Sequence, residues 1–224
     1  MTDADTPAAP PAAAPADAPP RADSARAAGA TARPAVWADA DPLSESLARA
    51  FHDDPVMMFF FRDASRRQAK LPKLFRLIFK LGLPHGGSLT TSGYEATALW
   101  RPPGKWEIPW WQYITNAAGF IDVLGADFPH ALGGMAVIEK NHPHDRPHWY
   151  LQVLGTDTAK QGKGYASLVM RRQLADIDAA HLPAYLESSK ESNIPVYASY
   201  GFEVTGALTL PGGPTLYPMW RDAR

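Results

Sequence analysis

The chain has 224 residues, a formal net charge of −1 at neutral pH and no cysteine. This length suits one domain with an additional tail, and the near-neutral charge argues against a dedicated nucleic-acid binder, which is usually clearly basic. Without cysteine the chain forms no disulfide and offers neither a thiolate metal ligand nor a cysteine nucleophile.

The first 35 residues are dominated by Ala and Pro and contain no Leu, Ile, Val or Phe. Such a stretch builds neither the apolar centre of a signal peptide nor a packed core. We therefore predict a disordered tail over 1–35 and one folded domain over 36–224, which begins near Trp37. No apolar run approaches the roughly 20 residues that span a bilayer, so we expect no membrane contact and a cytoplasmic protein.

The domain opens with two predicted helices. Asp41 and Pro42 have the residue types of an N-cap and a first helical position, and the helix they start ends before Pro55. The range 65–83 predicts a second helix, because apolar residues recur on one of its faces while Lys and Arg occupy much of the rest. We interpret this basic face as a solvated surface, although it also suits a membrane surface or an acidic partner.

A hairpin is expected next, from runs 86–94 and 95–100 with a Ser-Gly turn between them. An aromatic-rich stretch follows, and then a helix over about 127–140. Three histidines, His142, His144 and His148, lie close together in a Pro-rich loop. We expect them to be exposed loop residues and not a metal site, because no helical or carboxylate-rich ligand frame accompanies them.

The last third alternates strands and helices, which predicts a mixed α/β domain. The strand over 148–156 is apolar on both faces and so predicts a buried, central position. The remaining expected elements are a helix over 166–181, a strand over 184–188, a helix over 193–200 and closing strands over 202–210 and 215–221.

Between the 148–156 strand and the next helix lies the glycine-rich turn Gln161 to Ala166. Glycines at 162 and 164 let the backbone turn tightly, and the first turn of a helix offers unpaired N–H groups at its positive end. Lys160 and Lys163 add positive charge, so the turn suits a diphosphate. Its spacing fits neither the P-loop nor the Rossmann pattern, and without further signals it is an ordinary strand-to-helix turn.

Two motifs extend this interpretation. Gln161-Gly162-Lys163-Gly164-Tyr165-Ala166 resembles the [RQ]-x-x-G-x-[GA] motif of the GNAT superfamily of N-acetyltransferases, and the segment from Asn193 to Phe202 resembles that family's N-x-x-x-Y-x-x-x-G-F signature. The resemblance is strongest over 148–221. Within the superfamily the chain is most similar to the puromycin N-acetyltransferase-like, small-molecule branch, whose last strand carries a G-P-x-x-x-x-M pattern, here Gly213 to Met219.

The resemblance implies a GNAT-type fold, with a mixed central sheet, flanking helices and a cofactor site at the strand-turn-helix unit. It also implies a domain with an acceptor-binding half over 36–147 and an acetyl-CoA-binding half over 148–224. The cofactor-binding residues that it implies are Val153, Leu154, Gly155, Gln161, Gly162, Lys163, Gly164, Tyr165, Ala166 and Asn193. Acetyl-CoA is the expected co-substrate, and no metal is expected.

The implied reaction is direct attack of an amine on the thioester, with Tyr197 as the general acid that protonates the departing thiolate. The alternative for Tyr197 is a core tyrosine. Glu187 is the leading candidate for the general base, against an exposed structural role, and Glu139 and Asp54 are weaker candidates. A water chain that replaces a single base is also consistent with the family.

The expected partner is a small-molecule amine, for a monomer or homodimer that binds no nucleic acid. Two alternatives stay open, a protein lysine or N-terminal acetyltransferase and a CoA-binding module without turnover. Aromatic residues of the first half are candidates for an acceptor pocket, with core packing as the alternative for each. They are Phe59, Phe60, Phe61, Trp100, Trp106, Trp110 and Trp111.

Overall fold

A twisted, mixed sheet forms the centre of the molecule in the computed structural model, which describes residues 29–224. Its eight strands follow the order β1-β2-β3-β4-β5-β8-β6, and β7 pairs with β8. Every neighbouring pair is antiparallel except β4 and β5. The strands are β1 (Ala32–Pro34), β2 (Ser88–Thr91), β3 (Ala96–Arg101), β4 (Trp149–Thr156), β5 (Ala184–Ser188), β6 (Glu203–Val204), β7 (Leu208–Thr209) and β8 (Thr215–Arg221).

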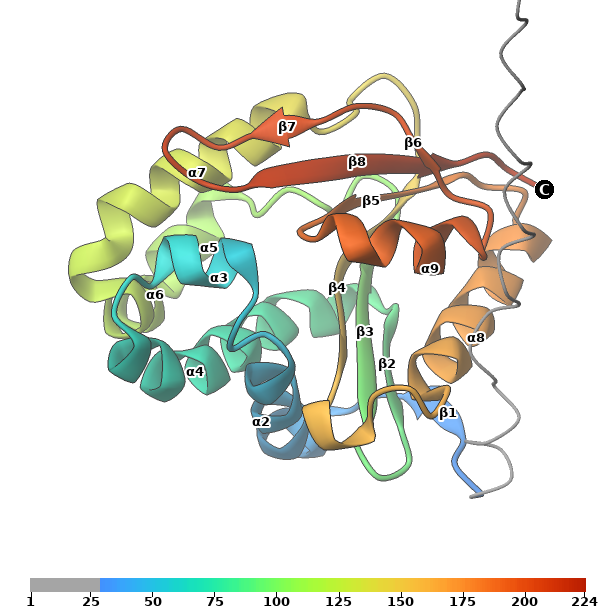
Figure 1. Ribbon diagram of the computed structural model, residues 1–224, viewed down its shortest axis with the longest axis horizontal. Coiled ribbons are helices and arrows are strands. Elements are labelled where there is room, and N and C mark those ends of the chain that lie inside the picture. The colour runs from blue at the N-terminus through green and yellow to red at the C-terminus, as the bar shows by residue number, and fades with distance from the viewer. Residues whose placement is uncertain (1–28) are drawn as a thin grey trace, which may run out of the picture.

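Helices cover both faces of this sheet (Figure 1). Helix α8 connects the parallel strands β4 and β5 and packs on one face, while α2 and α4 pack on the other. The helices are α2 (Ala40–Ala50), α3 (Pro55–Phe60), α4 (Ala64–Gly82), α5 (Trp110–Thr115), α6 (Ala117–Leu124), α7 (Phe128–Asn141), α8 (Tyr165–Ala179) and α9 (Ile194–Ala198).

Each face of the sheet has its own hydrophobic core. On the α8 side, Met170 and Ile177 of the helix pack with Trp100 of β3 and Leu186 of β5. On the opposite side, apolar residues from α2, α3, α4, α6 and α7 pack against β3, β4 and β8. The domain is therefore a three-layer α/β structure, in agreement with the fold class predicted from the sequence.

Strand β4 contains a bulge that changes which face its residues meet. Leu99 lies opposite Val153 and the next residue, Trp100, lies opposite Leu151, so Gln152 is an extra residue in β4. As a result Leu151 packs in the α8 core and Val153 in the opposite core, although residues two apart normally share a face. The buried Arg101 holds the bulge, because its Nε donates to Gln152 Oε1 over 2.8 Å.

Most predicted elements are confirmed to within a few residues, with five differences, the first of which is that helix α3 (Pro55–Phe60) was not predicted. The folded part begins before residue 36, because Ala32–Pro34 pairs with β2, whereas residues 1–28 of the predicted tail lie outside the described residues. Helix α2 begins at Ala40, and Asp41 pairs with Arg76 instead of capping it. The aromatic-rich stretch contains the helices α5 and α6, and the strand expected over 202–210 is two short strands.

Among the described residues, one helical stretch, Ala117–Asn141, is long and apolar enough by composition to cross a bilayer. It consists of α6 and α7, which the short 3-10 turn Gly125–Asp127 separates. Phe120, Leu124, Met135 and Ile138 on its inner side line an apolar cavity that is described below. Part of its apolar character therefore serves the interior of the domain.

The first strand is held to the sheet by a buried carboxylate. Asp39 accepts two hydrogen bonds from the Arg33 guanidinium, at 2.7 and 2.8 Å, and one from the Tyr94 hydroxyl at 3.0 Å. The backbone N–H of Val36 donates to the same carboxylate. These donors, Arg33 first, stabilise the charged form and lower the pKa of Asp39 to about 2.

We expect Asp39→Asn to lower the free energy of unfolding by about 1 to 2 kcal/mol at neutral pH. A carboxylate whose pKa is lowered by folding stabilises the protein above its unfolded pKa. The difference between variant and parent should therefore shrink as the pH falls from about 4 toward 2. Urea denaturation as a function of pH measures this.

The matched control is Asp53→Asn, whose side chain is 83% exposed. It should change the stability by less than about 0.5 kcal/mol. If both variants lose the same free energy of unfolding at neutral pH, the Asp39 carboxylate does not stabilise the fold in this way.

Candidate active site

A cavity of about 470 Å³ opens between β4, the turn before α8, and α9. Its wall contains nine of the ten residues predicted to bind the cofactor, together with Tyr197 and Glu187. The nine are Val153, Leu154, Gly155, Gln161, Gly162, Gly164, Tyr165, Ala166 and Asn193. The structure thus brings together two motifs that lie some 30 residues apart in the chain, because β5 carries the chain back beside β4.

The floor of this cavity is an unpaired strand edge. The parallel strands β4 and β5 pair only from Trp149–Ala184 to Leu151–Leu186, and beyond the bulge the last five residues of β4 have no strand partner on that side. Figure 1 shows β5 running across the direction of β4. Those backbone N–H and C=O groups of 152–156 that do not bond to β3 therefore face the cavity, where an extended ligand can pair with them as another strand would.

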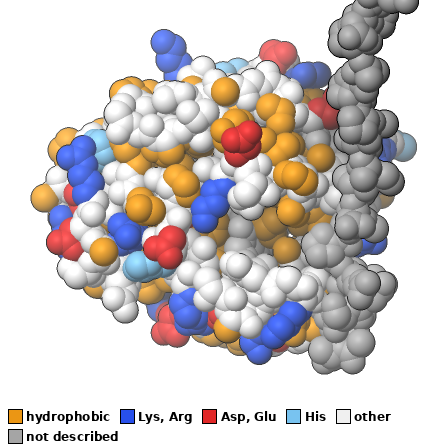
Figure 2. All heavy atoms as spheres, viewed as in Figure 1, with side chains coloured by type: hydrophobic (Ala, Val, Ile, Leu, Met, Phe, Trp, Pro, Cys, Tyr) orange, Lys and Arg blue, Asp and Glu red, His pale blue; other side chains and the backbone are white. Residues whose placement is uncertain are grey.

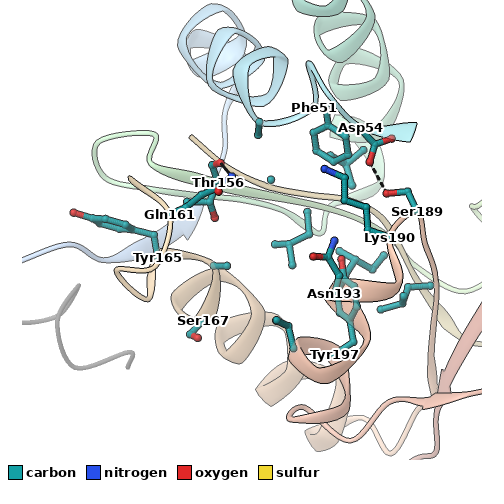
Figure 3. A pocket seen from close by; sticks show the side chains of 18 of the residues that line it. Phe51, Asp54, Thr156, Gln161, Tyr165, Ser167, Ser189, Lys190, Asn193 and Tyr197 are labelled. Atoms are coloured by element: carbon teal, nitrogen blue, oxygen red, sulfur yellow. Dashed lines mark hydrogen bonds between the residues drawn. The ribbon is translucent and has the colours of Figure 1, made fainter. Parts of the chain in front are cut away.

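The turn after β4 has the geometry of an anion site. Gly162 and Gly164 have φ values of +73° and +83°, which glycine adopts readily, and Gly164 is the N-cap of α8. The first N–H groups of this 15-residue helix have no partner within the helix and lie at its positive end. Figure 3 shows the ring of Tyr165 directed away from Asn193 and Tyr197, so the part of this residue that the turn can present to a ligand is its backbone.

Lys160 lines the cavity but Lys163 does not. The Nζ atom of Lys163 lies 3.4 Å from the carbonyl oxygen of Ala159, within the turn itself. Lys163 stays a predicted cofactor-binding residue through its backbone N–H group in the turn. The position of its ammonium group could not be predicted, because the direction of a side chain in a turn depends on backbone angles that residue types alone do not specify.

Gly155 allows α2 to approach β4 closely. A Cβ atom at this position would lie 2.6 Å from Leu47 Cδ2 and 2.9 Å from Phe51 Cε2. Helix α2 consequently forms one side of the cavity, with Ala50 and Phe51 in its wall. Sequence reasoning missed these two residues, because neither carries a polar group that marks a site.

Asn193 and Tyr197 lie one helical turn apart and project into the cavity from the side of α9 (Figure 3). Burial, and then the negative charge of Asp54, raise the pKa of Tyr197 well above its ordinary value. The phenol is therefore protonated at neutral pH and can donate its proton but not accept one. Its role as a general acid stays a prediction: the raised pKa keeps the proton on the phenol, although it also makes the phenol a weaker acid.

Asp54 connects the two halves of the domain at this site. It caps α3, because its Oδ1 accepts from the N–H groups of Val56 and Met57, and its Oδ2 accepts a hydrogen bond from Ser189 Oγ (Figure 3). The Asp-Pro pair at 54–55 has the helix-start pattern that was assigned at 41–42, so this signal was present in the sequence. Nothing in the sequence pointed to Ser189.

A second cavity of about 250 Å³ adjoins the first and is mostly apolar. It lies among α3, α4, α6 and α7, and the two cavities share Phe51, Asp54, Gln152, Val153, Glu187 and Ser189. Four carboxylates lie in its wall, those of Asp54, Glu107, Glu139 and Glu187, and its lining includes neither Lys nor Arg. It therefore suits an apolar molecule that carries a positive charge.

The aromatic candidates for an acceptor pocket divide into three groups. Phe60 and Trp106 line the apolar cavity. Phe61 and Trp100 are buried in the cores, and Phe59 packs against Phe60 and His130. Trp110 is 74% exposed and Trp111 is also exposed, and neither lines the cavity, so the hypothesis that these two form the pocket is corrected.

Glu187 faces the junction of the two cavities from β5. Its side chain is only 4% exposed, so the alternative of an exposed structural role is wrong. Its Oε1 atom is buried without a hydrogen-bond partner and lies 3.5 Å from Nδ1 of His142. A buried carboxylate oxygen without a donor is costly, which points to a functional reason for its position.

The histidine loop differs from the expectation. His144 is exposed, but His142 and His148 are buried and their Nε2 atoms lie 2.9 Å apart. Burial occurs because the loop folds back between α7 and β4 and stacks His142 against Trp106, with ring centres 3.9 Å apart. No group of three or more potential metal ligands occurs within residues 29–224.

Charged side chains are scattered singly over the face that bears α9 (Figure 2). Acidic and basic groups alternate there, and no continuous basic patch crosses this face. Several cations of α4 are already paired, such as Lys70 and Lys73 with Asp122. The basic face of this helix is therefore locally neutralised.

Known proteins resemble this chain in sequence and in structure, although no protein-family model matches it. The chain is 27% identical over 176 residues to an uncharacterized N-acetyltransferase of Schizosaccharomyces pombe, which covers 73% of this chain and 70% of the relative. A crystal structure of histone acetyltransferase HPA2 and related acetyltransferase from Corynebacterium glutamicum superposes with a TM-score of 0.67. It has 23% identity and covers 87% of this chain and 97% of that one.

More distant structures share the same architecture. The polyamine N-acetyltransferase of Drosophila melanogaster has a TM-score of 0.56 and 12% identity, over 86% of this chain and 99% of that one. Arylalkylamine N-acetyltransferase 2 of Aedes aegypti has a TM-score of 0.54 and 13% identity, over 87% and 99%. These similarities confirm the predicted fold class and the resemblance to GNAT acetyltransferases, and they agree with the predicted enzyme class, an N-acetyltransferase.

Proposed function

We propose that the protein transfers an acetyl group from acetyl-CoA to the primary amine of a small, largely apolar molecule. The observation that carries this proposal is the junction of two cavities. One has a strand edge and a helix N-terminus in its wall, the other is apolar with carboxylates, and they meet at Glu187, Ser189 and Asp54. Two reactants bound in adjoining cavities are held in reach of each other.

The first cavity suits the co-substrate. The N–H groups at the start of α8 and the turn at Gly162 would hold the diphosphate, with Lys160 beside them. The unpaired edge of β4 would hold the extended pantetheine arm, and Asn193 lies on the opposite wall. Acetyl-CoA supplies an acetyl group that is activated as a thioester.

The second cavity suits the acceptor. Its apolar lining favours a molecule with an aromatic or aliphatic body, and its carboxylates favour an ammonium group over a neutral or acidic one. Amines are the substrates that the Drosophila and Aedes relatives are named for. A chamber of about 250 Å³ among four helices favours a small molecule over the side chain of a folded protein.

The residues at the junction provide the required proton transfers. The amine must lose a proton before its nitrogen attacks the thioester carbon, and Glu187 is the buried carboxylate that accepts it. As the carbon–sulfur bond breaks, Tyr197 donates its hydroxyl proton to the departing thiolate. Backbone N–H groups at the free edge of β4 would stabilise the negative charge on the carbonyl oxygen.

Calorimetric titration with acetyl-CoA tests the cofactor site. The parent should bind, and Gly162→Glu should weaken binding at least about tenfold, because it places a negative charge in the wall that would hold the diphosphate. Gly212→Glu is the matched control, since Gly212 also has a positive φ, +67°, also has open space at its Cβ, and lines neither cavity. No binding by the parent, or equal weakening in both variants, would refute the assignment.

Tyr197→Phe should lower kcat in a thiol-release assay about 100-fold or more, while acetyl-CoA still binds, because the variant removes the proton donor. Tyr217→Phe, which lines neither cavity, should keep the parental kcat. An unchanged kcat in Tyr197→Phe would exclude the phenol from the mechanism. Cofactor binding without turnover in the parent, across a panel of amines, would instead favour the CoA-binding module.

The acceptor site is tested with apolar monoamines in the same assay. Trp106→Ala should raise the acceptor KM about tenfold, because it removes apolar surface from the cavity wall. Trp110→Ala removes the same side chain from an exposed position and should leave KM unchanged. If both variants keep the acceptor KM of the parent, the acceptor does not bind in this cavity.

A further inference from the structure

A row of three buried ionisable side chains leads from the wall of the acceptor cavity, which Glu187 and His142 line. Glu187 Oε1 is 3.5 Å from His142 Nδ1, and His142 Nε2 is 2.9 Å from His148 Nε2. His148 Nδ1 in turn lies 2.9 Å from the carbonyl oxygen of Arg146, an exposed loop residue. The side chains of Glu187 and His142 are 4% and 2% exposed, so the row crosses the interior from the cavity to the surface.

The carbonyl at the outer end determines which nitrogens carry protons. A carbonyl oxygen only accepts, so His148 Nδ1 carries a proton and donates it. In the neutral ring, His148 Nε2 then accepts a hydrogen bond from Nε2–H of His142. Neutral His142 is left with a bare Nδ1 that faces a carboxylate oxygen without any donor. Both His142 Nδ1 and Glu187 Oε1 are then acceptors, and one added proton would form a hydrogen bond between them.

Other ionisable side chains surround this row. His142 meets the edges of Tyr150 from β4 and Tyr185 from β5. Burial, the charge of Glu187 and a hydrogen bond to its carboxylate raise the pKa of both phenols, so they stay neutral. The Oε1 atom that faces His142 has no such partner. The Arg146 guanidinium lies over Trp220 of β8, Arg101 lies beyond Tyr150, and His144 faces Glu107 outside the row.

We propose that Glu187, His142 and His148 form a proton relay that carries the proton of the acceptor amine from the cavity to the exposed loop at Arg146. The proposal rests on the proposed function. Glu187 takes the proton from the ammonium group, and it passes to the bare Nδ1 of His142. The Nε2 proton of His142 moves to His148 Nε2, and the Nδ1 proton of His148 leaves to water at the loop.

The balance of this relay is one proton in and one proton out for each acetyl transfer. Glu187 returns to the carboxylate form, and both rings end neutral with their protons on the opposite nitrogens. Rotation or exchange with water at the loop restores the starting arrangement. His142 also lines the acceptor cavity, whereas His148 lines neither cavity. Both histidines act through Glu187, so they are positioning residues, and Glu187 is the catalytic one.

The dependence of kcat on pH tests the relay. In the parent, Glu187 and His142 share one proton, so the acid limb of the profile belongs to the coupled unit. In His142→Gln no ring nitrogen faces Glu187, so the carboxylate must hold the proton alone. We expect kcat at neutral pH to fall about tenfold or more and the acid limb to move to lower pH by about one unit or more.

His144→Gln, from the same loop but outside the row, should keep the acid limb in place. His148→Gln should lower kcat in the same direction as His142→Gln. Calorimetric binding of acetyl-CoA by each variant shows that it is folded. An acid limb that His142→Gln leaves unmoved, or that His144→Gln moves equally, would overturn the relay.

Nitrogen NMR of the histidine rings in the parent provides a test that needs no turnover. Above the pH range in which the rings titrate, His148 should hold its proton on Nδ1 and His142 on Nε2. Protonation of His142 on Nδ1 instead would break the row and overturn the relay. If the histidines show the expected tautomers but the protein acetylates no amine, the proposed function is refuted. The hydrogen-bond order from Arg146 to Glu187 would still stand.

Discussion

The separation of β4 from β5 is the constraint on which the site depends. The two parallel strands pair for only three residues, and their pairing stops next to the bulge at Gln152. From there on, the edge of β4 is exposed to the cavity. Arg101 holds this bulge from the neighbouring strand, although burial lowers the pKa of its guanidinium to about 10. The cost of burying that cation is offset in part by the two hydrogen bonds that it donates to Gln152 and to the Ile78 carbonyl.

Everything else at the site follows from this separation. The edge of β4 that β5 leaves open becomes the floor of the larger cavity, and the change of face at the bulge turns Val153 toward the helices that enclose the smaller one. Tyr185 and Glu187 alternate with Ala184 and Leu186 on β5, so Glu187 faces away from the α8 core and toward the cavities. A proton donor and a proton acceptor thus lie in the walls of one junction.

The sequence predicted the second half of the domain well because its signals are local. The turn at Gln161 to Ala166 and the segment from Asn193 to Phe202 are short motifs whose function depends on backbone geometry, and the structure brings both to one cavity. The first half was harder to predict. Its cavity is made by residues from four helices that meet only in three dimensions, and apolar residues in a cavity wall have the same types as those in a core.

The histidines show that residue types also fail to predict burial. His142 and His148 are polar residues in a Pro-rich loop, which favours exposure, and only the packing of Trp106 and Tyr185 around them makes them buried. Lys163 looked equivalent to Lys160 by position, yet only Lys160 lines the cavity. Residue types locate a turn or a helix start, but the direction of each side chain depends on neighbours that are distant in sequence.

The open edge of β4 also bears on strand addition by other chains. An unpaired strand edge is a template on which another chain can add a strand, and proteins usually protect such edges with charge, proline or a covering element. Here the edge lies inside the sheet and not at its margin, with Phe51 from the α2 side and Val196 and Tyr197 from α9 in the walls around it. This edge is therefore open to an extended ligand inside the cavity and is not part of the outer margin of the sheet.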